Sequence, residues 1–198
     1  SGQRFGDFLR ENITEPVGMV DTEFYVPPGK HERLAQVYGY DRNGRLFPEE
    51  GLGGANDYFV DPVFQPGGHG LVSTAMDYLR FSQMVANGGI LDGVRIISPM
   101  SVKLMSTNHL PADIPQEIST ANGTSFGLDF AVVEDPVEAE SYSRGEFYWS
   151  GAAGTWFWID PVEDLVFVGM INQFGRLRPD MRSMTRRLVY SAVMDSQQ

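Results

Sequence analysis

The sequence predicts an α+β fold in which helices pack on an antiparallel sheet. Strand-like runs follow one another over residues 126–172, and a helix closes the chain after Pro179. Hydrophobic residues make up 42% of the chain and aromatic residues 12%, which is enough apolar mass for a core. The length of 198 residues fits one large domain or slightly more.

The first part of the chain is expected to be rich in helices and loops. Phe5, Phe8 and Leu9 repeat at helical spacing, and this helix should stop near Asn12 because Pro16 disfavours helix just before it. Residues 27–70 are rich in Gly and Pro, with one strand-like stretch over 34–40. A long irregular segment inside a compact protein often borders a functional site.

Two helices and a hairpin are predicted from local signals in the middle of the chain. A helix begins at Ser73, where Thr74 and Asp77 fit a capping box, and it ends at the glycine pair 88–89. Residues 90–97 form a tight hairpin around Asp92-Gly93. Ser98-Pro99 then opens a second helix that is expected to end near Asn108.

The remaining segments predict the sheet and its closing helix. Strands are expected over 126–133, from Tyr148 onward, over 155–160 and over 165–172, with a turn at 161–164 between the last two. The closing helix has an apolar face and a polar face that is expected to be solvated. The apolar face comprises Met181, Met184, Leu188 and Ala192, and the polar face comprises Arg182, Arg186 and Arg187.

Composition and missing motifs exclude several classes of function. The net charge of -11 repels phosphate backbones and anionic lipid, so neither nucleic acid nor a membrane surface is expected as a partner. The chain has no cysteine, and His31, His69 and His109 are dispersed, so no metal site is expected. No glycine-rich nucleotide loop is present, and no cofactor is expected. Two serine-hydrolase motifs, Gly-x-Ser-x-Gly and Ser-x-x-Lys, are also absent from the sequence.

Four motifs occur in a fixed order along the chain. They are EPVGMVDTEF at 15–24, PGGHGLVST at 66–74, GGILDGVRIISP at 88–99 and FYWSGAAGTWFWIDP at 147–161. In this order they resemble the serine β-lactamase-like family, which has the penicillin-binding-protein fold, and most of all its class C-like and carboxylesterase members. The resemblance implies that residues 1–198 are the C-terminal portion of one such domain, with a helical and loop-rich part at 1–115 and the sheet with its last helix at 116–198.

The resemblance also implies a candidate site in the fourth motif. Trp149, Ser150 and Gly151 stand where the family has its third catalytic motif, which contacts substrate, and Ala152 would donate its backbone N–H to the oxyanion. An exposed strand edge can supply such N–H donors, and a glycine lets substrate approach the backbone, so 148–152 is expected to be an edge strand that lines a cleft.

Alternative interpretations of these and other residues remain open. Trp149 could be a core aromatic, and Ser150 an ordinary exposed serine. His69 is expected to be a surface residue, and the letters Ser106-Thr107-Asn108 to match a family motif by coincidence. Gly67, Gly68 and Gly70 are expected to serve the backbone conformation. Arg176 and Arg178 are expected to be solvated, the alternative being contact with a substrate carboxylate.

The function implied is that of a serine hydrolase acting on a small ester or amide through an acyl-enzyme. In the family a Ser-x-x-Lys supplies the nucleophile and base before the segment that resembles residues 1–24, so this chain alone is expected to be inactive. The missing N-terminal half, or an oligomer, is expected to cover its exposed apolar faces. The alternatives are a non-catalytic relative and a D-Ala-D-Ala peptidase or β-lactamase; substrate and compartment stay open.

Overall fold

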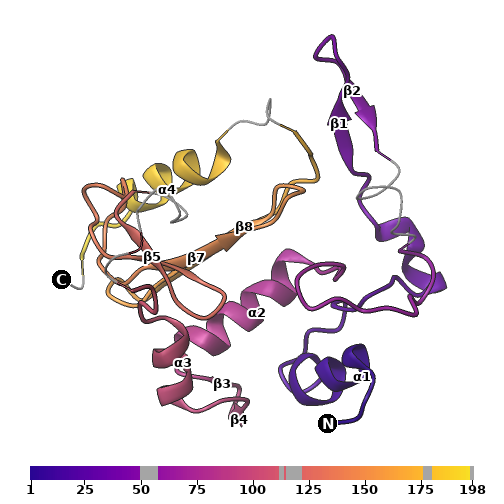
Figure 1. The fold of residues 1–198 in the computed structure, drawn as a ribbon, viewed down its shortest axis with the longest axis horizontal. Coiled ribbons are helices and arrows are strands. Elements are labelled where there is room, and N and C mark those ends of the chain that lie inside the picture. Colours follow the sequence, from indigo (N-terminus) through magenta and orange to yellow (C-terminus); the bar gives the residue numbers. More distant parts are fainter. Residues whose placement is uncertain (50–57, 112–113, 115–121, 176–179, 197–198) are drawn as a thin grey trace. The chain divides into compact units, whose positions relative to one another are not determined.

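The computed structural model describes residues 1–49, 58–111, 114, 122–175 and 180–196. These residues form two compact units (Figure 1). The first consists of Ser1–Phe81, Ala152–Thr155 and Met170–Arg178, and the second of Ser82–Gly151, Trp156–Gly169 and Pro179–Gln198. The boundary that the sequence predicts between residues 115 and 116 lies outside the described residues.

The first unit contains short helices and one hairpin. Helix α1 (Phe5–Leu9) continues as the π-helical turn η1 (Arg10–Thr14), so the first helix runs past Asn12. The 3-10 helix η2 (Pro28–Arg33) is followed by the antiparallel pair β1 (Tyr38–Tyr40) and β2 (Leu46–Pro48). The predicted stretch over 34–40 therefore contains one arm of a hairpin. Its turn is held by the Asp41 side chain, which accepts hydrogen bonds from the backbone N–H groups of Asn43 and Arg45.

Helix α2 (Ala75–Ala86) begins where its capping signal predicts. The Thr74 hydroxyl accepts the backbone N–H of Asp77 at 3.1 Å. The helix ends before Gly88 and Gly89, whose φ values of 69° and 88° place both in the left-handed region. The division between the two units falls within this helix, between Phe81 and Ser82.

Two further predictions from local signals are confirmed in the second unit. Strands β3 (Ile90–Leu91) and β4 (Val94–Arg95) form the expected hairpin, in which Asp92 and Gly93 both have positive φ. Helix α3 (Pro99–Met105) begins at Ser98, whose side chain accepts the N–H of Ser101 at 3.0 Å. It ends at Met105 rather than near Asn108.

The core of the second unit is an antiparallel sheet with the strand order β5-β6-β7-β8-β9. Its strands are β5 (Thr124–Phe126), β6 (Ala131–Val133), β7 (Phe147–Ser150), β8 (Trp156–Asp160) and β9 (Leu165–Gly169). The expected strand over 126–133 is confirmed at 131–133, which form β6, but residues 127–130 are a turn between β5 and β6, because Gly127 donates to the carbonyl of Phe130 and the chain reverses. The α+β class is confirmed.

Helix α4 (Met181–Ser191) lies beside this sheet (Figure 1). It packs on the sheet with the opposite face from the one predicted. Arg186 is 3% exposed, whereas Met184 and Leu188 are 53% and 68% exposed. The prediction of a solvated arginine face was wrong for Arg186. The reason is that the sheet presents aromatic ring faces and the buried carboxyl group of Glu146 to the helix, and both interact favourably with a guanidinium group.

Candidate functional site

Strand β7, which carries the predicted site, is the middle strand of the five-stranded sheet. The prediction that 148–152 forms an edge strand was therefore wrong. Strand order depends on contacts between segments far apart in sequence, and the turn between β5 and β6 places two further strands on one side of β7.

The C-terminal end of β7 nevertheless extends beyond its neighbour β6. The register on that side ends at the pair Ala131 and Tyr148, whereas β8 pairs with β7 as far as Ser150. Backbone groups of successive residues point alternately to the two neighbouring strands. Val133 exchanges hydrogen bonds with Gly145 and Glu146, so the alternation directs the N–H and C=O of Tyr148 and Ser150 toward the β6 side. Within the described residues no strand residue is paired with Ser150 on that side.

Burial changes sharply along β7. Phe147 and Tyr148 are each 3% exposed, while Trp149 is 40% exposed and Ser150 is also exposed. The Trp149 ring meets the ring of Phe126 at 5.2 Å between centroids, with an angle of 77° between the planes. Phe126 was not identified from the sequence, because its contact with Trp149 depends on the β5–β6 turn. The backbone of this turn is fixed to the segment after α3, where the N–H of His109 donates to the carbonyl of Phe126 at 2.9 Å.

The residues that follow β7 form a turn in the first unit. The carbonyl of Ala153 accepts the N–H of Gln173 at 2.7 Å, and Gly154 has a φ of 100°, which favours glycine. Ala152, the predicted oxyanion donor, is exposed, and Gly151 at the end of the second unit is half-buried. Their assignment to a site stays a prediction.

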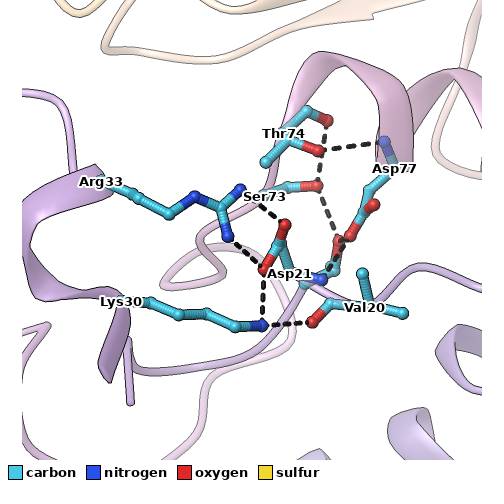
Figure 2. A network of polar contacts seen from close by, with 8 residues as sticks. Val20, Asp21, Lys30, Arg33, Ser73, Thr74 and Asp77 are labelled. Atoms are coloured by element: carbon cyan, nitrogen blue, oxygen red, sulfur yellow. Dashed lines mark hydrogen bonds and ion pairs between the residues drawn. The ribbon is translucent and has the colours of Figure 1, made fainter. Parts of the chain in front are cut away.

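A polar network in the first unit joins the first two sequence motifs (Figure 2). Asp77 accepts the backbone N–H of Asp21 at 2.7 Å and the Thr22 hydroxyl at 2.9 Å. The Thr22 and Ser73 hydroxyls lie 2.7 Å apart. The carboxylate of Asp77, three residues after the second motif, therefore binds residues of the first motif, and this network holds two segments of the chain together.

Asp21 also binds two cations in this network (Figure 2). Its carboxylate accepts from Lys30 at 2.6 Å and from both terminal nitrogens of Arg33 at 2.9 and 2.7 Å. The hydrogen bonds from Arg33 and then Lys30 lower the pKa of Asp21 to about 2. The adjacent pocket, which includes Tyr25 and Val72, holds about 70 Å³. This is well below the roughly 300–1,000 Å³ of small-molecule sites, so the network is a structural element of the unit.

The other residues singled out from the sequence have structural roles or are exposed. Gly70 has a φ of 97°, while Gly67 and Gly68 face open space and His69 is exposed. The hydroxyls of Ser106 and Thr107 donate to carbonyls of α3, and the coincidental match of these letters to a family motif stays a prediction. Arg176 and Arg178 lie outside the described residues. No cluster of His, Asp or Glu suited to a metal ion, and no helix capable of crossing a membrane, occurs among the described residues.

Comparisons with known proteins give a consistent family. The family model described as Beta-lactamase matches residues 1–190. Protein Rv1367c of Mycobacterium tuberculosis is 37% identical over 180 residues, covering 87% of this chain and 44% of that protein. Lovastatin esterase of Penicillium rubens is 25% identical over 211 residues, covering 96% of this chain and 51% of that protein.

A solved structure agrees with these sequence matches. A mutant of simvastatin synthase from Aspergillus terreus superimposes with a TM-score of 0.80 at 20% identity, covering 96% of this chain and 50% of that one. At this identity the likeness establishes the β-lactamase/transpeptidase-like fold. The chain spans about half the length of the relatives that it matches.

Proposed function

Because this chain belongs to the Beta-lactamase family, we propose that the full-length protein is a serine hydrolase that cleaves carboxylic esters through an acyl-enzyme. The serine nucleophile and its lysine base would come from residues outside these 198, since the chain contains no Ser-x-x-Lys. The serine Oγ attacks the ester carbonyl, the alcohol leaves with a proton, and water then cleaves the acyl-enzyme.

One observation supports this proposal more than any other. The end of β7 is exposed while the start of the same strand is buried, and the exposed end extends beyond β6. A strand end of this kind can bring backbone N–H groups to a substrate carbonyl, which is what oxyanion stabilisation needs. We assign the oxyanion contact to the Ala152 N–H, and contacts along the substrate to Trp149, Ser150 and Gly151.

The side chains of this strand end favour esters over β-lactams. A penicillin or cephalosporin carries a carboxylate, which lactamases of the family meet with the lysine and hydroxyl of Lys-Thr-Gly. Trp149 occupies the lysine position and offers one indole N–H and an apolar face. Loss of a charge-assisted hydrogen bond costs about 1.5–3 kcal/mol, or roughly tenfold to a hundredfold in kcat/KM. The names of lovastatin esterase and simvastatin synthase support an ester or acyl-transfer reaction as well.

Side-by-side kinetics of the full-length protein on a p-nitrophenyl ester and on nitrocefin test the proposal. We expect the higher kcat/KM on the ester, and we expect Trp149→Ala to lower it. Val137→Ala, at an exposed position in a turn, is the control variant and should leave the kinetics unchanged. A higher kcat/KM on nitrocefin, or turnover of a D-Ala-D-Ala peptide in place of both, contradicts ester hydrolysis. The absence of any turnover would favour a non-catalytic relative.

A further inference from the structure

Two carboxyl groups are completely buried between the sheet and α4 in the second unit. Glu146, just before β7, and Asp160, at the end of β8, are both 0% exposed. Neither was identified from the sequence. The side chain that joins them is Tyr190 of α4, whose hydroxyl lies 2.5 Å from Asp160 Oδ2 and 3.1 Å from Glu146 Oε2.

The chain places Glu146 in this cluster by a local irregularity. Gly145 and Glu146 both oppose Val133, with Gly145 donating to its carbonyl and Glu146 accepting its N–H. Gly145 has a φ of 88°, as the first residue of a glycine bulge requires. Bulges change the direction of the side chains beside them, and this one lies where β7 begins.

The number of hydrogens in the cluster limits its protonation state. A tyrosine hydroxyl has one hydrogen, so it can donate a full hydrogen bond to one of the two carboxyl groups, and a full hydrogen bond with the other needs a hydrogen from that carboxyl group. Asp160 already accepts backbone N–H groups of Val162 and Glu163 on Oδ1, and the shorter Tyr190 contact is with its Oδ2. The hydroxyl therefore donates to Asp160, which leaves Glu146 Oε2 facing the Tyr190 oxygen.

The charged groups around the cluster also favour a neutral Glu146. Arg186 is the cation that contacts Glu146, through Oε1, and Arg182 lies over the Tyr148 ring at 4.2 Å. On the other sides of the cluster, Ser141 donates to Glu146 Oε2 at 2.8 Å and the Tyr142 ring stacks on Tyr190. Two buried carboxylates facing one contacting guanidinium would leave an unbalanced negative charge, which is costly away from water.

We propose that Glu146 is protonated in the folded protein. Its carboxyl O–H donates a hydrogen bond to the Tyr190 hydroxyl, and the Tyr190 O–H donates a hydrogen bond to Asp160. The chain Glu146–Tyr190–Asp160 then ties the beginning of β7 and the end of β8 to α4. These two strands are paired as far as Ser150 and Trp156, at the exposed end of β7. Glu146 and Tyr190 thereby act as positioning residues for that end. This last consequence rests on the proposed function, whereas the protonation of Glu146 does not.

The pH dependence follows from the protonated state. Burial raises the pKa of Glu146 above its ordinary value of 4.5. A carboxyl whose pKa is higher in the folded state binds its proton more tightly there than in the unfolded chain. Its contribution to stability is complete below the unfolded pKa and is lost as the pH rises through the folded pKa.

The direct test is the carboxyl carbon-13 resonance of Glu146 in the full-length protein, followed against pH and assigned by its disappearance in Glu146→Gln. We expect it to remain that of a protonated carboxyl well above pH 4.5. Titration at or below that value overturns the proposal, whether or not the protein hydrolyses esters.

Variants give a second, independent test. Glutamine imitates a protonated carboxyl, so Glu146→Gln should change the unfolding equilibrium constant by less than about tenfold at pH 7. The variant should also lack the loss of stability that we expect of the wild type at higher pH. If Glu146 were ionised and paired with Arg186, Glu146→Gln should instead shift the equilibrium toward the unfolded protein by more than about a hundredfold at pH 7.

Measuring kcat/KM distinguishes a role of Glu146 and Tyr190 in positioning the end of β7 from a role in stability alone. In the folded protein at 25 °C, kcat/KM of the wild type should decrease at alkaline pH, and Glu146→Gln should retain kcat/KM at neutral pH without that decrease. Tyr190→Phe should lower kcat/KM, whereas Tyr142→Phe, on the stacked neighbour, should not. A wild-type pH profile that Glu146→Gln leaves unchanged contradicts the positioning role.

Discussion

Asp21, Thr22 and Ser73, together with Asp77 just after the second motif, show why particular residue types occur in and beside the first two motifs. The hydroxyls of Thr22 and Ser73 and the carboxylate of Asp77 make hydrogen bonds that link the loop after η1 to the beginning of α2, and the Asp21 carboxylate links the same loop to η2 (Figure 2). Their identities follow from this network, which belongs to the scaffold. The resemblance that they carry therefore identifies a fold with more certainty than it identifies an active site.

Replacing Asp21 with Asn should destabilise the full-length protein at pH 7 by about 1–3 kcal/mol, since two cations lose their shared carboxylate. The pKa of Asp21 is lowered from 3.8 to about 2, so its stabilisation is complete above pH 3.8 and is lost as the pH falls to about 2. Denaturant unfolding should therefore show wild type and variant converging toward pH 2. Asp195→Asn, at an exposed position near the C-terminus, is the control. A difference that persists unchanged at pH 2 contradicts this account.

Phe126→Ala should weaken the selectivity of the candidate site for apolar substrates. The edge-to-face contact fixes the Trp149 ring, and aromatic pairs contribute about 0.5–1.5 kcal/mol, which corresponds to roughly two- to tenfold. We expect kcat/KM to fall by that factor for a long-chain p-nitrophenyl ester and less for the acetate. Equal losses on both esters would show that Phe126 contributes to stability alone.

At the scale of elements, the sequence predicted those whose signals are local. The beginning of α2, the Asp92-Gly93 hairpin and the Ser98 cap each depend on two or three neighbouring residues, and all three are confirmed. The β5–β6 turn was missed because Phe126, Leu128 and Phe130 alternate through it at the spacing of a strand. Its reversal requires Gly127 to pack against the backbone at Met105, which lies far away in sequence.

The position of β7 and the orientation of α4 depend on contacts across the fold. Hydrophobic periodicity predicted an apolar face for α4, but the sheet surface beneath it presents Tyr148 and Trp158 rings and two carboxyl groups. A guanidinium fits such a surface better than an alkyl chain does. Glu146, which no motif marks, is recognisable in retrospect only from the glycine before it.

Two neighbouring arginines of α4 should respond very differently to the same substitution. Arg186→Met removes a buried guanidinium, its hydrogen bond to Glu146 and its contacts with two aromatic rings, so it should cost about 1.5–3 kcal/mol of unfolding free energy. Arg187→Met, whose pair with Glu140 is exposed on both sides, should cost less than about 1 kcal/mol. Chemical denaturation of the full-length variants measures both. Similar costs for the two would mean that α4 packs with the face that its hydrophobic pattern predicted.

At the scale of the whole molecule, the matched relatives carry about half of their length beyond the region that they share with this chain. In the proposed mechanism, the serine, the lysine and one of the two oxyanion donors would lie in that other half. The chain supplies the strand end and its aromatic contact. We therefore expect no ester turnover from the 198-residue chain alone, measured after removal of contaminating esterases. Turnover that survives such purification contradicts this division of the active site.

The exposed side of α4 provides a physical test of the same expectation. Met184 and Leu188 lie one helical turn apart, and Met194 beyond the helix is also exposed. Monomeric proteins rarely leave extended apolar surface in water, so we expect the isolated chain to self-associate or to melt without cooperativity. Light scattering should show a larger mass for the isolated chain than for its Met184→Lys/Leu188→Lys double variant. Val137→Lys, at an exposed apolar position in a turn, should not have this effect. A monodisperse isolated chain that melts cooperatively as a monomer would mean that the exposed side of α4 needs no covering, and that these 198 residues fold on their own.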